Sequence, residues 1–256
     1  MKYHNPIITG FHPDPSVCRV GNDFYLVNSS FEYFPGIPIY HSTDLTHWEQ
    51  IGHVLDRKNQ LKLVSGAPNC LGIYAPTIRY HEGIFYCIVT NVGGRSGGNF
   101  FVYTTDPYGR WSNPVKLPFA GIDPSLFFDE DGRIYYTGTD TGIYIAEITF
   151  DVVRNDTPKR NELPVSIQNV KCGEKHYIWN GSGGNNPEGP HLYRIHDMYY
   201  LMIAEGGTEY CHMVTIARSK NVYGPYEACP HNPVLSNRST CLNIKAIGHT
   251  AVTLWN

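Results

Sequence analysis

Residues 121–137 read GIDPSLFFDEDGRIYYT, and this stretch decides the predicted fold. An Asp-Pro-Ser start leads into an apolar run, then into the turn DEDG, and then into an aromatic run. Two short apolar or aromatic runs around a Gly/Asp turn predict a β-hairpin. Three other stretches follow the same plan. They are HPDPSVCRVGNDFYL (12–26), IYAPTIRYHEGIFYC (73–87) and NPEGPHLYRIHDMYYL (186–201).

A fifth, partial copy follows in AIGHTAVTLWN (246–256), which resembles the first half of the hairpin plan. Corresponding positions in the five copies recur at steps of 48 to 65 residues, the spacing of a four-stranded propeller blade with its loops. The residues at these positions are Asp14, Ala75, Asp123, Glu188 and His249. The repeat predicts an all-β fold, a five-bladed β-propeller with its last blade incomplete, as a single domain over residues 1–256. A β-sandwich or a solenoid with fortuitous hairpins is the alternative.

Composition agrees with a β fold and limits the partners. The chain of 256 residues has 25 Gly, 18 Pro and 13% aromatic residues, which suits many short strands joined by turns. Lys and Arg number 20 against 23 Asp and Glu, for a formal net charge of −3. The chain has no excess of basic residues that could bind a phosphate backbone, so we expect no nucleic-acid partner. No apolar run is long enough to span a membrane, so we expect no membrane partner either.

The cellular location is predicted from the start of the chain and from its cysteines. MKYHNPIITGFHPDPS has neither a long apolar run nor a small-residue cleavage site, so we expect no signal peptide there. The seven cysteines are odd in number and form no CxxC pair. They are interpreted as reduced thiols, most of them packing residues, in a cytoplasmic protein. The sequon at Asn28 has no role in that location.

Three of the five corresponding positions carry acids: Asp14, Asp123 and Glu188. In a propeller the first strand of each blade lines the central channel, so these positions would face one another. Turn chemistry explains either Asp-Pro-Ser segment taken singly, but it explains three matched acids poorly. Glycoside hydrolysis needs one protonated and one ionised carboxyl group, and a third acid can tune the proton donor.

Aromatic residues near these acids are candidates for stacking on sugar rings. They are Phe31, Tyr74 and Phe127, and core packing is the alternative role for each of them. The histidines form no HExxH motif or paired spacing, so no catalytic metal is predicted.

Several independent segments resemble glycoside hydrolase family 43, the family of β-xylosidases and α-L-arabinofuranosidases. The segments are NPIITGFHPDPSVCRVGNDFYLV (5–27), FEYFPGIPIYHSTDLTHWEQIG (31–52), GIYAPT (72–77), GIDPSLFFDEDGR (121–133), PEGPHLY (187–193) and AEGGT (204–208). The resemblance runs from residue 5 to about residue 252 and implies a five-bladed propeller that hydrolyses with inversion. It also implies that Asp14 is the general base, that Glu188 is the general acid, and that Asp123 tunes and orients this acid.

The same resemblance extends to other residues of the site. His249, in IGHT, matches a family histidine on the central axis, near a calcium ion or a water, while no cofactor is required for the reaction. Phe31 and Phe127 match residues that line the sugar pocket, and Tyr74 stands where the family usually has Trp. The family continues beyond the position that matches Asn256, and an Arg that contacts the sugar comes from that later part. The chain is therefore expected to be a C-terminally truncated member.

The sequence thus predicts an inverting exo-glycosidase that removes terminal β-D-xylosyl or α-L-arabinofuranosyl residues from plant-type oligosaccharides. The motifs do not separate xylosides from arabinofuranosides, and they predict no oligomeric state. Two alternatives stay open: a sugar-binding relic that lost activity with its last blade, and a propeller that serves only as an interaction platform.

Overall fold

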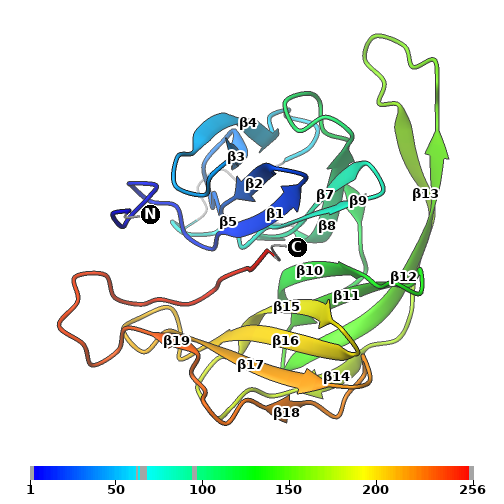
Figure 1. The fold of residues 1–256 in the computed structure, drawn as a ribbon. Helices are drawn as coiled ribbons and strands as arrows, with labels where there is room; N and C mark the ends of the chain where they lie inside the picture. The colour runs from blue at the N-terminus through cyan, green and yellow to red at the C-terminus, as the bar shows by residue number, and fades with distance from the viewer. Residues whose placement is uncertain (1–2, 62, 64–67, 94–96, 254–256) are drawn as a thin grey trace. The chain divides into compact units, whose positions relative to one another are not determined.

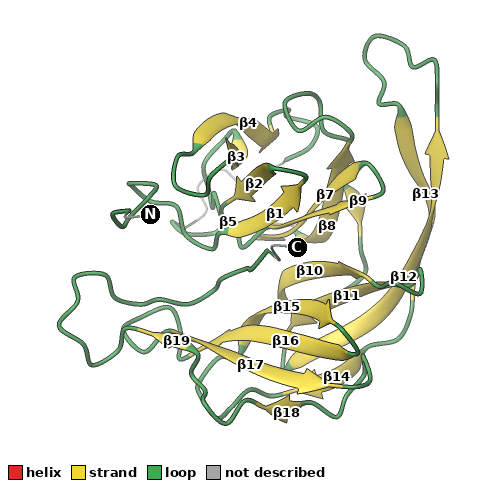
Figure 2. Cartoon of the chain, viewed as in Figure 1, coloured by secondary structure: helices red, strands yellow, loops and turns green. Residues whose placement is uncertain are grey.

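The computed structural model describes residues 3–61, 63, 68–93 and 97–253. Within these ranges the secondary structure consists of β-strands without a helix, and the paired strands described below run antiparallel (Figures 1 and 2). The described residues accordingly include no helix that could cross a membrane. The all-β prediction is confirmed.

The strands form four sheets, each made from one predicted hairpin and the strands that follow it. The first sheet has the order β1 (Ser16–Val20), β2 (Asp23–Val27), β3 (Gly36–Ser42), β4 (Glu49–Leu55). The second has β5 (Gly72–Ile73), β7 (Ile84–Val92), β8 (Gly98–Thr104), β9 (Val115–Lys116), with β6 (Thr77–His81) also on β7. The third has β10 (Ile122–Phe128), β11 (Ile134–Thr139), β12 (Ile143–Arg154), β13 (Val165–Cys172), with β14 (His176–Trp179) also on β12. The fourth has β15 (Glu188–Ile195), β16 (Met198–Glu205), β17 (Met213–Ser219), β18 (Glu227–Ala228), with β19 (Leu235–Ser236) also on β17.

The first strand of the third sheet contains a bulge around its proline. Ile122 lies opposite Thr139, whereas Ser125 lies opposite Thr137, so three steps along β10 match two along β11. Pro124 falls inside this shift. Because proline has no N–H to donate to a ladder, it is tolerated in a strand at an edge or a bulge.

The other three sheets repeat this bulge at their own Xaa-Pro dipeptides. The equivalent backbone pairs are Pro13–Ser29 and Ser16–Val27 in the first sheet, Tyr74–Thr90 and Thr77–Ile88 in the second, and Glu188–Ala204 and His191–Met202 in the fourth. Bulges of one kind at four equivalent places show that the sheets are copies of one structural unit. The predicted repeat is therefore real at the level of backbone pairing.

The bulges also correct the alignment of the acids. The residue immediately before the proline is Asp14, Ala75, Asp123 or Gly189. Asp14, Asp123 and Gly189 share a left-handed backbone, with φ of 56°, 54° and 61°. Glu188 precedes this position by one residue, so its alignment with the two aspartates is wrong by one. The fourth copy places glycine in the strained conformation and displaces its acid to the preceding residue.

The chain divides into two compact units, each with two sheets as its main content. Unit 1 comprises Met1–Phe119, Phe150–Val170 and Ala251–Asn256, and unit 2 comprises Ala120–Thr149 and Lys171–Thr250. In each unit, apolar side chains from two sheets form a buried core. The core of unit 1 includes Val27, Ile39, Val54, Phe85, Val102 and Trp111. The core of unit 2 includes Tyr135, Ile145, Leu192, Leu201, Ile203 and Val222. The single-domain prediction stays a prediction.

The predicted fifth copy forms no strand in its described part. Residues 246–253 are without regular secondary structure, and residues 254–256 lie outside the described ranges. The four sheets correspond to the four complete hairpins of the sequence. An incomplete fifth blade is therefore not confirmed.

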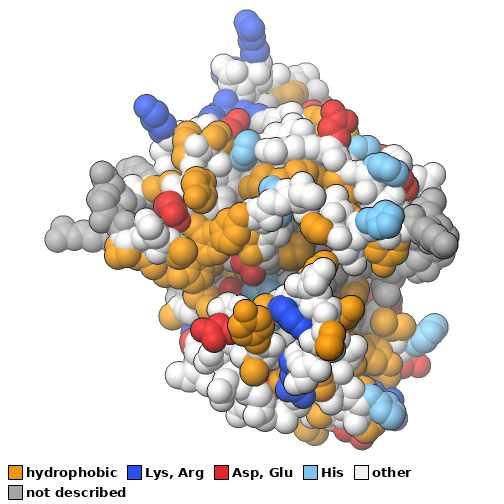
Figure 3. Space-filling view, turned by 90° about the vertical axis from the view of Figure 1, so that its left-hand side faces the viewer, with side chains coloured by type: hydrophobic (Ala, Val, Ile, Leu, Met, Phe, Trp, Pro, Cys, Tyr) orange, Lys and Arg blue, Asp and Glu red, His pale blue; other side chains and the backbone are white. Residues whose placement is uncertain are grey.

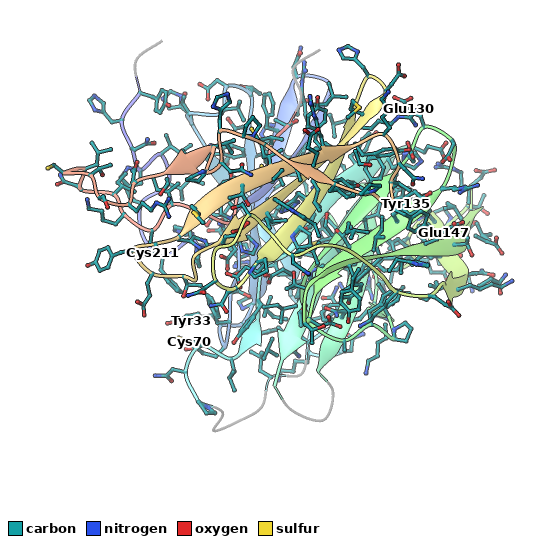
Figure 4. The ribbon with its side chains drawn as sticks, turned by 90° about the horizontal axis from the view of Figure 1, so that it is seen from below. Tyr33, Cys70, Glu130, Tyr135, Glu147 and Cys211 are labelled. Atoms are coloured by element: carbon teal, nitrogen blue, oxygen red, sulfur yellow. The ribbon has the colours of Figure 1, made fainter. Side chains whose placement is uncertain are left out.

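The cysteines are more exposed than the sequence suggested. All seven are free thiols, but among them only Cys18 and Cys87 are buried. Cys70, Cys211 and Cys241 are exposed, and the first two are labelled in Figure 4. The prediction that most of the cysteines pack in the core is wrong.

Candidate active site

Unit 2 brings three of the predicted site residues together, beginning with Asp123 and Glu188. Asp123 lies in the bulge of β10 and is 6% exposed. Its Oδ2 accepts a hydrogen bond of 3.2 Å from the backbone N–H of Gly189. That N–H belongs to the peptide bond that follows Glu188, which is the first residue of β15 and half-buried. Asp123 therefore fixes the backbone at the predicted proton donor.

His249 joins this pair from a distant part of the chain. It is 8% exposed and has φ of 47°. A Cβ atom on Gly189 would lie 3.0 Å from Cε1 of His249, so the imidazole covers the residue next to Glu188. The preceding residue, Gly248, lies against the ring of His212, which leaves no room for a side chain at that position. His249 therefore lies against the residue that follows Glu188, while its place on a central axis and its role toward a sugar stay predictions.

A buried tyrosine pair lies close to Asp123. The hydroxyl groups of Tyr136 and Tyr144 are 3.4 Å apart, and Tyr144 donates to the carbonyl oxygen of Ala120 at 2.6 Å. Burial raises the pKa of Tyr136 well above its usual value, and the nearby Tyr144 and the charge of Asp123 add to this effect. Tyr136 is thus a neutral, protonated neighbour of Asp123 over the physiological range.

The fourth predicted residue, Asp14, lies in unit 1. It is fixed by Asn28 and Ser29, the two residues that follow β2. Ser29 Oγ donates to Asp14 Oδ2 at 2.5 Å, and Ser29 N donates to the carbonyl oxygen of Pro13 at 3.2 Å. Asn28 is 1% exposed, and its Nδ2 donates to the carbonyl oxygens of His12 and Pro13 at 2.9 and 3.0 Å. The Asn28–Ser29 pair therefore sets the backbone and the carboxylate orientation of Asp14.

Sequence reasoning missed both of these residues. The segment VNSSF follows the aromatic strand of the first copy and was seen only as a sequon. Its buried asparagine, immediately beyond an aromatic strand, was the available signal, because an amide in such a place needs backbone partners.

Unit 1 also brings together two of the three predicted aromatic residues, Phe31 and Tyr74. The ring of Phe31 stacks on Phe11 with centroids 5.7 Å apart and meets Tyr74 edge-on at the same distance. Large hydrophobic side chains reach the surface as well, as Figure 3 shows for one face, and the rings of Phe11 and Tyr33 are 67% and 62% exposed. Amphipathic or flat rings of this kind can stack on the C–H faces of sugars.

Phe127 has different surroundings in unit 2. It packs against the core, with its ring centroid 6.3 Å from that of Tyr135 and 6.1 Å from that of Tyr199. These contacts agree with the packing alternative. Its role toward a sugar stays a prediction.

The described residues offer little for a metal ion. They contain no group of three or more His, Cys, Asp and Glu side chains that could hold one. Calcium takes six to eight oxygen ligands. A calcium ion near His249 stays a prediction, and no chemical step below uses one.

These features define an all-β repeat protein whose four sheets begin with proline bulges, three of which carry an acid. The sequence profile described as "Glycosyl hydrolases family 43" matches residues 3–254. The chain belongs to glycoside hydrolase family 43.

Individual relatives agree with this assignment. The chain is 47% identical over 251 residues to a non-reducing end α-L-arabinofuranosidase of Bacteroides ovatus, covering 96% of the chain and 44% of that protein. It is 48% identical over 243 residues to a xylosidase/arabinosidase of Butyrivibrio fibrisolvens, covering 92% and 45%. The chain spans about half the length of the curated relatives it matches.

Solved structures show the same relationship. A structure titled "Bacteroides ovatus Xyloglucan PUL GH43B" is 44% identical, with a TM-score of 0.84 over 99% of this chain and 48% of that one. A xylan β-1,4-xylosidase from Bacillus halodurans is 38% identical, with a TM-score of 0.84 over 98% and 48%.

Proposed function

We propose that this chain supplies the catalytic residues of an inverting exo-glycosidase that removes terminal β-D-xylosyl or α-L-arabinofuranosyl residues from plant-type oligosaccharides. The observation that carries the proposal is the hydrogen bond from Gly189 N to Asp123 Oδ2, which links one acid to the backbone of the other. Relatives at 47% and 48% identity have names that include these two sugars. For the fold, we propose a five-bladed propeller whose last blade is incomplete in this chain.

Glu188 acts as the general acid in this proposal. It protonates the glycosidic oxygen while the bond to the anomeric carbon breaks, so that the leaving group departs as a neutral alcohol. Asp123 orients Glu188 through the following peptide, and its negative charge favours the protonated form of the acid. His249 lies against that same peptide and limits its movement.

Asp14 acts as the general base. It takes a proton from the water that attacks the anomeric carbon from the opposite face of the sugar ring. Inversion requires room for this water, and inverting enzymes hold the two carboxyl groups roughly 6.5–9.5 Å apart. Ser29 Oγ donates to Oδ2 of Asp14 and so orients the carboxylate that would take this proton.

The sugar-binding residues in this proposal are Phe31, Tyr74, Phe127 and His249. The ring pair of Phe31 and Tyr74 supports it, since two edge-on rings form a corner against which a pentose can pack. The tyrosine ring is smaller than the tryptophan usual in the family. We therefore propose that this corner contributes to the choice between xylosides and arabinofuranosides.

The experiment that tests the proposal is hydrolysis of p-nitrophenyl β-D-xylopyranoside and p-nitrophenyl α-L-arabinofuranoside side by side by the natural protein that carries this chain. The product anomer is followed by NMR from the first minutes. We expect turnover of at least one substrate with inverted configuration, and loss of several orders of magnitude in the rate for Asp14→Ala. Retention of configuration would contradict the mechanism. Binding of xylobiose without any turnover would identify a sugar-binding relic instead.

A further inference from the structure

Glu205, the last residue of β16, is a fully buried carboxylate that the proposed mechanism does not use. It lies in unit 2 and is 0% exposed. Both oxygens are surrounded by donors, as a buried carboxylate requires. The donors are Ser182 N at 2.6 Å and Thr215 Oγ1 at 2.7 Å to Oε1, and Gly184 N at 2.7 Å and Ser182 Oγ at 3.1 Å to Oε2.

Three of these four hydrogen bonds come from one short loop, and this loop is shaped around the carboxylate. A Cβ atom at Gly181 would lie 2.6 Å from Oε1 of Glu205, and one at Gly184 would lie 2.6 Å from Oε2. Both positions therefore exclude every residue except glycine. The sequence NGSGG (180–184) is explained by its close approach to Glu205.

The loop leads directly to the predicted general acid. Immediately beyond it, Gly206 N donates to the carbonyl oxygen of Asn185 at 2.7 Å. Three residues after Asn185, Glu188 begins β15 and pairs with Ala204. Ala204 and Glu205, the last two residues of β16, and Gly206 after them thus contact the segment that leads to Glu188.

We propose that Glu205 is a positioning residue for the general acid. Its carboxylate fixes the 181–184 loop, and the loop fixes the start of β15, so that the carboxyl group of Glu188 stays at the glycosidic oxygen. This inference rests on the proposed function, because it takes Glu188 as the proton donor. Glu205 has no contact with the substrate in this proposal, and it acts through Glu188 alone.

The test is Glu205→Gln, which keeps the size of the side chain and replaces one acceptor oxygen with an NH₂ donor. One backbone N–H, of Ser182 or Gly184, then faces a donor and loses its partner. The readout is kcat/KM for the p-nitrophenyl and the methyl glycoside of the sugar that the wild-type enzyme hydrolyses. The methyl glycoside needs the proton, whereas the p-nitrophenyl glycoside needs it little. We expect the methyl glycoside to lose about tenfold more activity than the p-nitrophenyl glycoside, mainly in kcat.

Asp129→Asn is the matched control. Asp129 is also a buried acid of unit 2, 5% exposed, and it accepts from Arg194 Nη1 at 2.8 Å and from the Tyr199 hydroxyl at 2.6 Å. Neither partner is among the donors to Glu205 named above. We expect this variant to be destabilised while the ratio of the two substrates stays as in the wild type.

An equal loss on both substrates in Glu205→Gln would overturn the inference, because it would show a structural role only. Glu188→Ala separates this failure from failure of the proposed function. If Glu188→Ala itself shows no dependence on the leaving group, the proposed function is wrong. If Glu188→Ala shows a dependence on the leaving group and Glu205→Gln does not, the inference about Glu205 fails and the proposed function stands.

A milder variant keeps the test valid if Glu205→Gln does not fold. Thr215→Val removes one donor to Glu205 from a residue that is 0% exposed, with little change in volume. We expect a smaller loss that again depends on the leaving group, and no additional loss when it is combined with Glu188→Ala. An additional loss of the same size in that double variant would contradict the inference.

Discussion

The imidazole of His249 occupies the space that a side chain on Gly189 would need, with Cε1 3.0 Å from the position of a Cβ atom. Gly189 also has φ of 61°, and its N–H donates to Asp123. Gly189, which has no side chain, thus lies between the imidazole of His249 and the backbone of Glu188. This contact explains why the left-handed position of the fourth copy holds glycine.

Gly189→Ala is therefore expected to damage the site more than the fold. The left-handed backbone alone costs about 1–2 kcal/mol for alanine, and the new methyl group must also displace His249. Gly132→Ala is the control, because Gly132 has φ of 84° in a turn and nothing within 4 Å of a Cβ. Denaturant unfolding and turnover are measured for both. We expect at least a tenfold loss of turnover for Gly189→Ala and almost none for Gly132→Ala; equal activities would contradict the contact.

Ser29→Ala is expected to lower kcat about tenfold, because a hydrogen bond to a charged group contributes roughly 1.5–3 kcal/mol. Ser29 Oγ donates to Asp14, and its loss frees the carboxylate to rotate. The control is the neighbouring Ser30→Ala, whose hydroxyl accepts instead from Ile37 N at 3.0 Å. Steady-state kinetics and a melting curve are recorded for both variants. If Ser30→Ala loses as much kcat as Ser29→Ala, the orientation of Asp14 is not what Ser29 provides.

Asp140 predicts a pH dependence of stability. Burial alone would raise the pKa of Asp140, but the hydrogen bond from Lys175, with those from Thr141 and Tyr177, lowers it to about 2 from the ordinary 3.8. The folded state therefore gains stability from the ionised form above about pH 4, and it loses this gain as the pH falls toward 2.

The measurement is the urea midpoint of wild type, Asp140→Asn and Lys175→Met between pH 7 and pH 2.5. Lys175 Nζ lies 2.9 Å from Asp140 Oδ2, so both variants remove the same ion pair. We expect both to be less stable than the wild type at pH 7 and to approach it at the lowest pH. A constant difference over the whole range would exclude the ion pair as its cause.

Thiol reactivity tests the description of the cysteines. Burial raises the pKa of Cys18 to about 12 and also raises that of Cys87, so neither forms the reactive thiolate in the folded protein. Cys70, Cys211 and Cys241 are exposed. With a disulfide reagent at pH 8, peptide mapping should find these three modified first. Modification of Cys18 or Cys87 at the same rate without denaturant would show that the core of unit 1 opens readily.

The repeat and most of the strand pairs were predictable from the sequence because the cause is local. Each copy carries an Xaa-Pro dipeptide before an apolar run, and a proline inside a strand is tolerated at an edge or a bulge. The position of Glu188 was not predictable in the same way. Residue type alone aligns Glu188 with Asp123. The left-handed φ of Gly189 shows that Gly189, not Glu188, is the residue that corresponds to Asp123.

The supporting residues were beyond a reading of the sequence for a different reason. Asn28, Ser29 and Glu205 act through hydrogen bonds to partners 10 to 23 residues away. Such partners become visible only when the strand register is known, because a shift of one residue turns a side chain to the other face of the sheet. The glycines of the 181–184 loop were visible, but their cause was a buried carboxylate on another strand.

The central claim is that Glu188 donates the proton to the leaving group, and the leaving-group dependence of Glu188→Ala tests it most directly. kcat/KM is measured for the p-nitrophenyl and methyl glycosides of the preferred sugar, in the wild type and in Glu188→Ala. We predict a loss of about two to four orders of magnitude on the methyl glycoside, the size of a general-acid contribution, and a much smaller loss on the p-nitrophenyl glycoside. The same loss on both substrates would contradict the assignment.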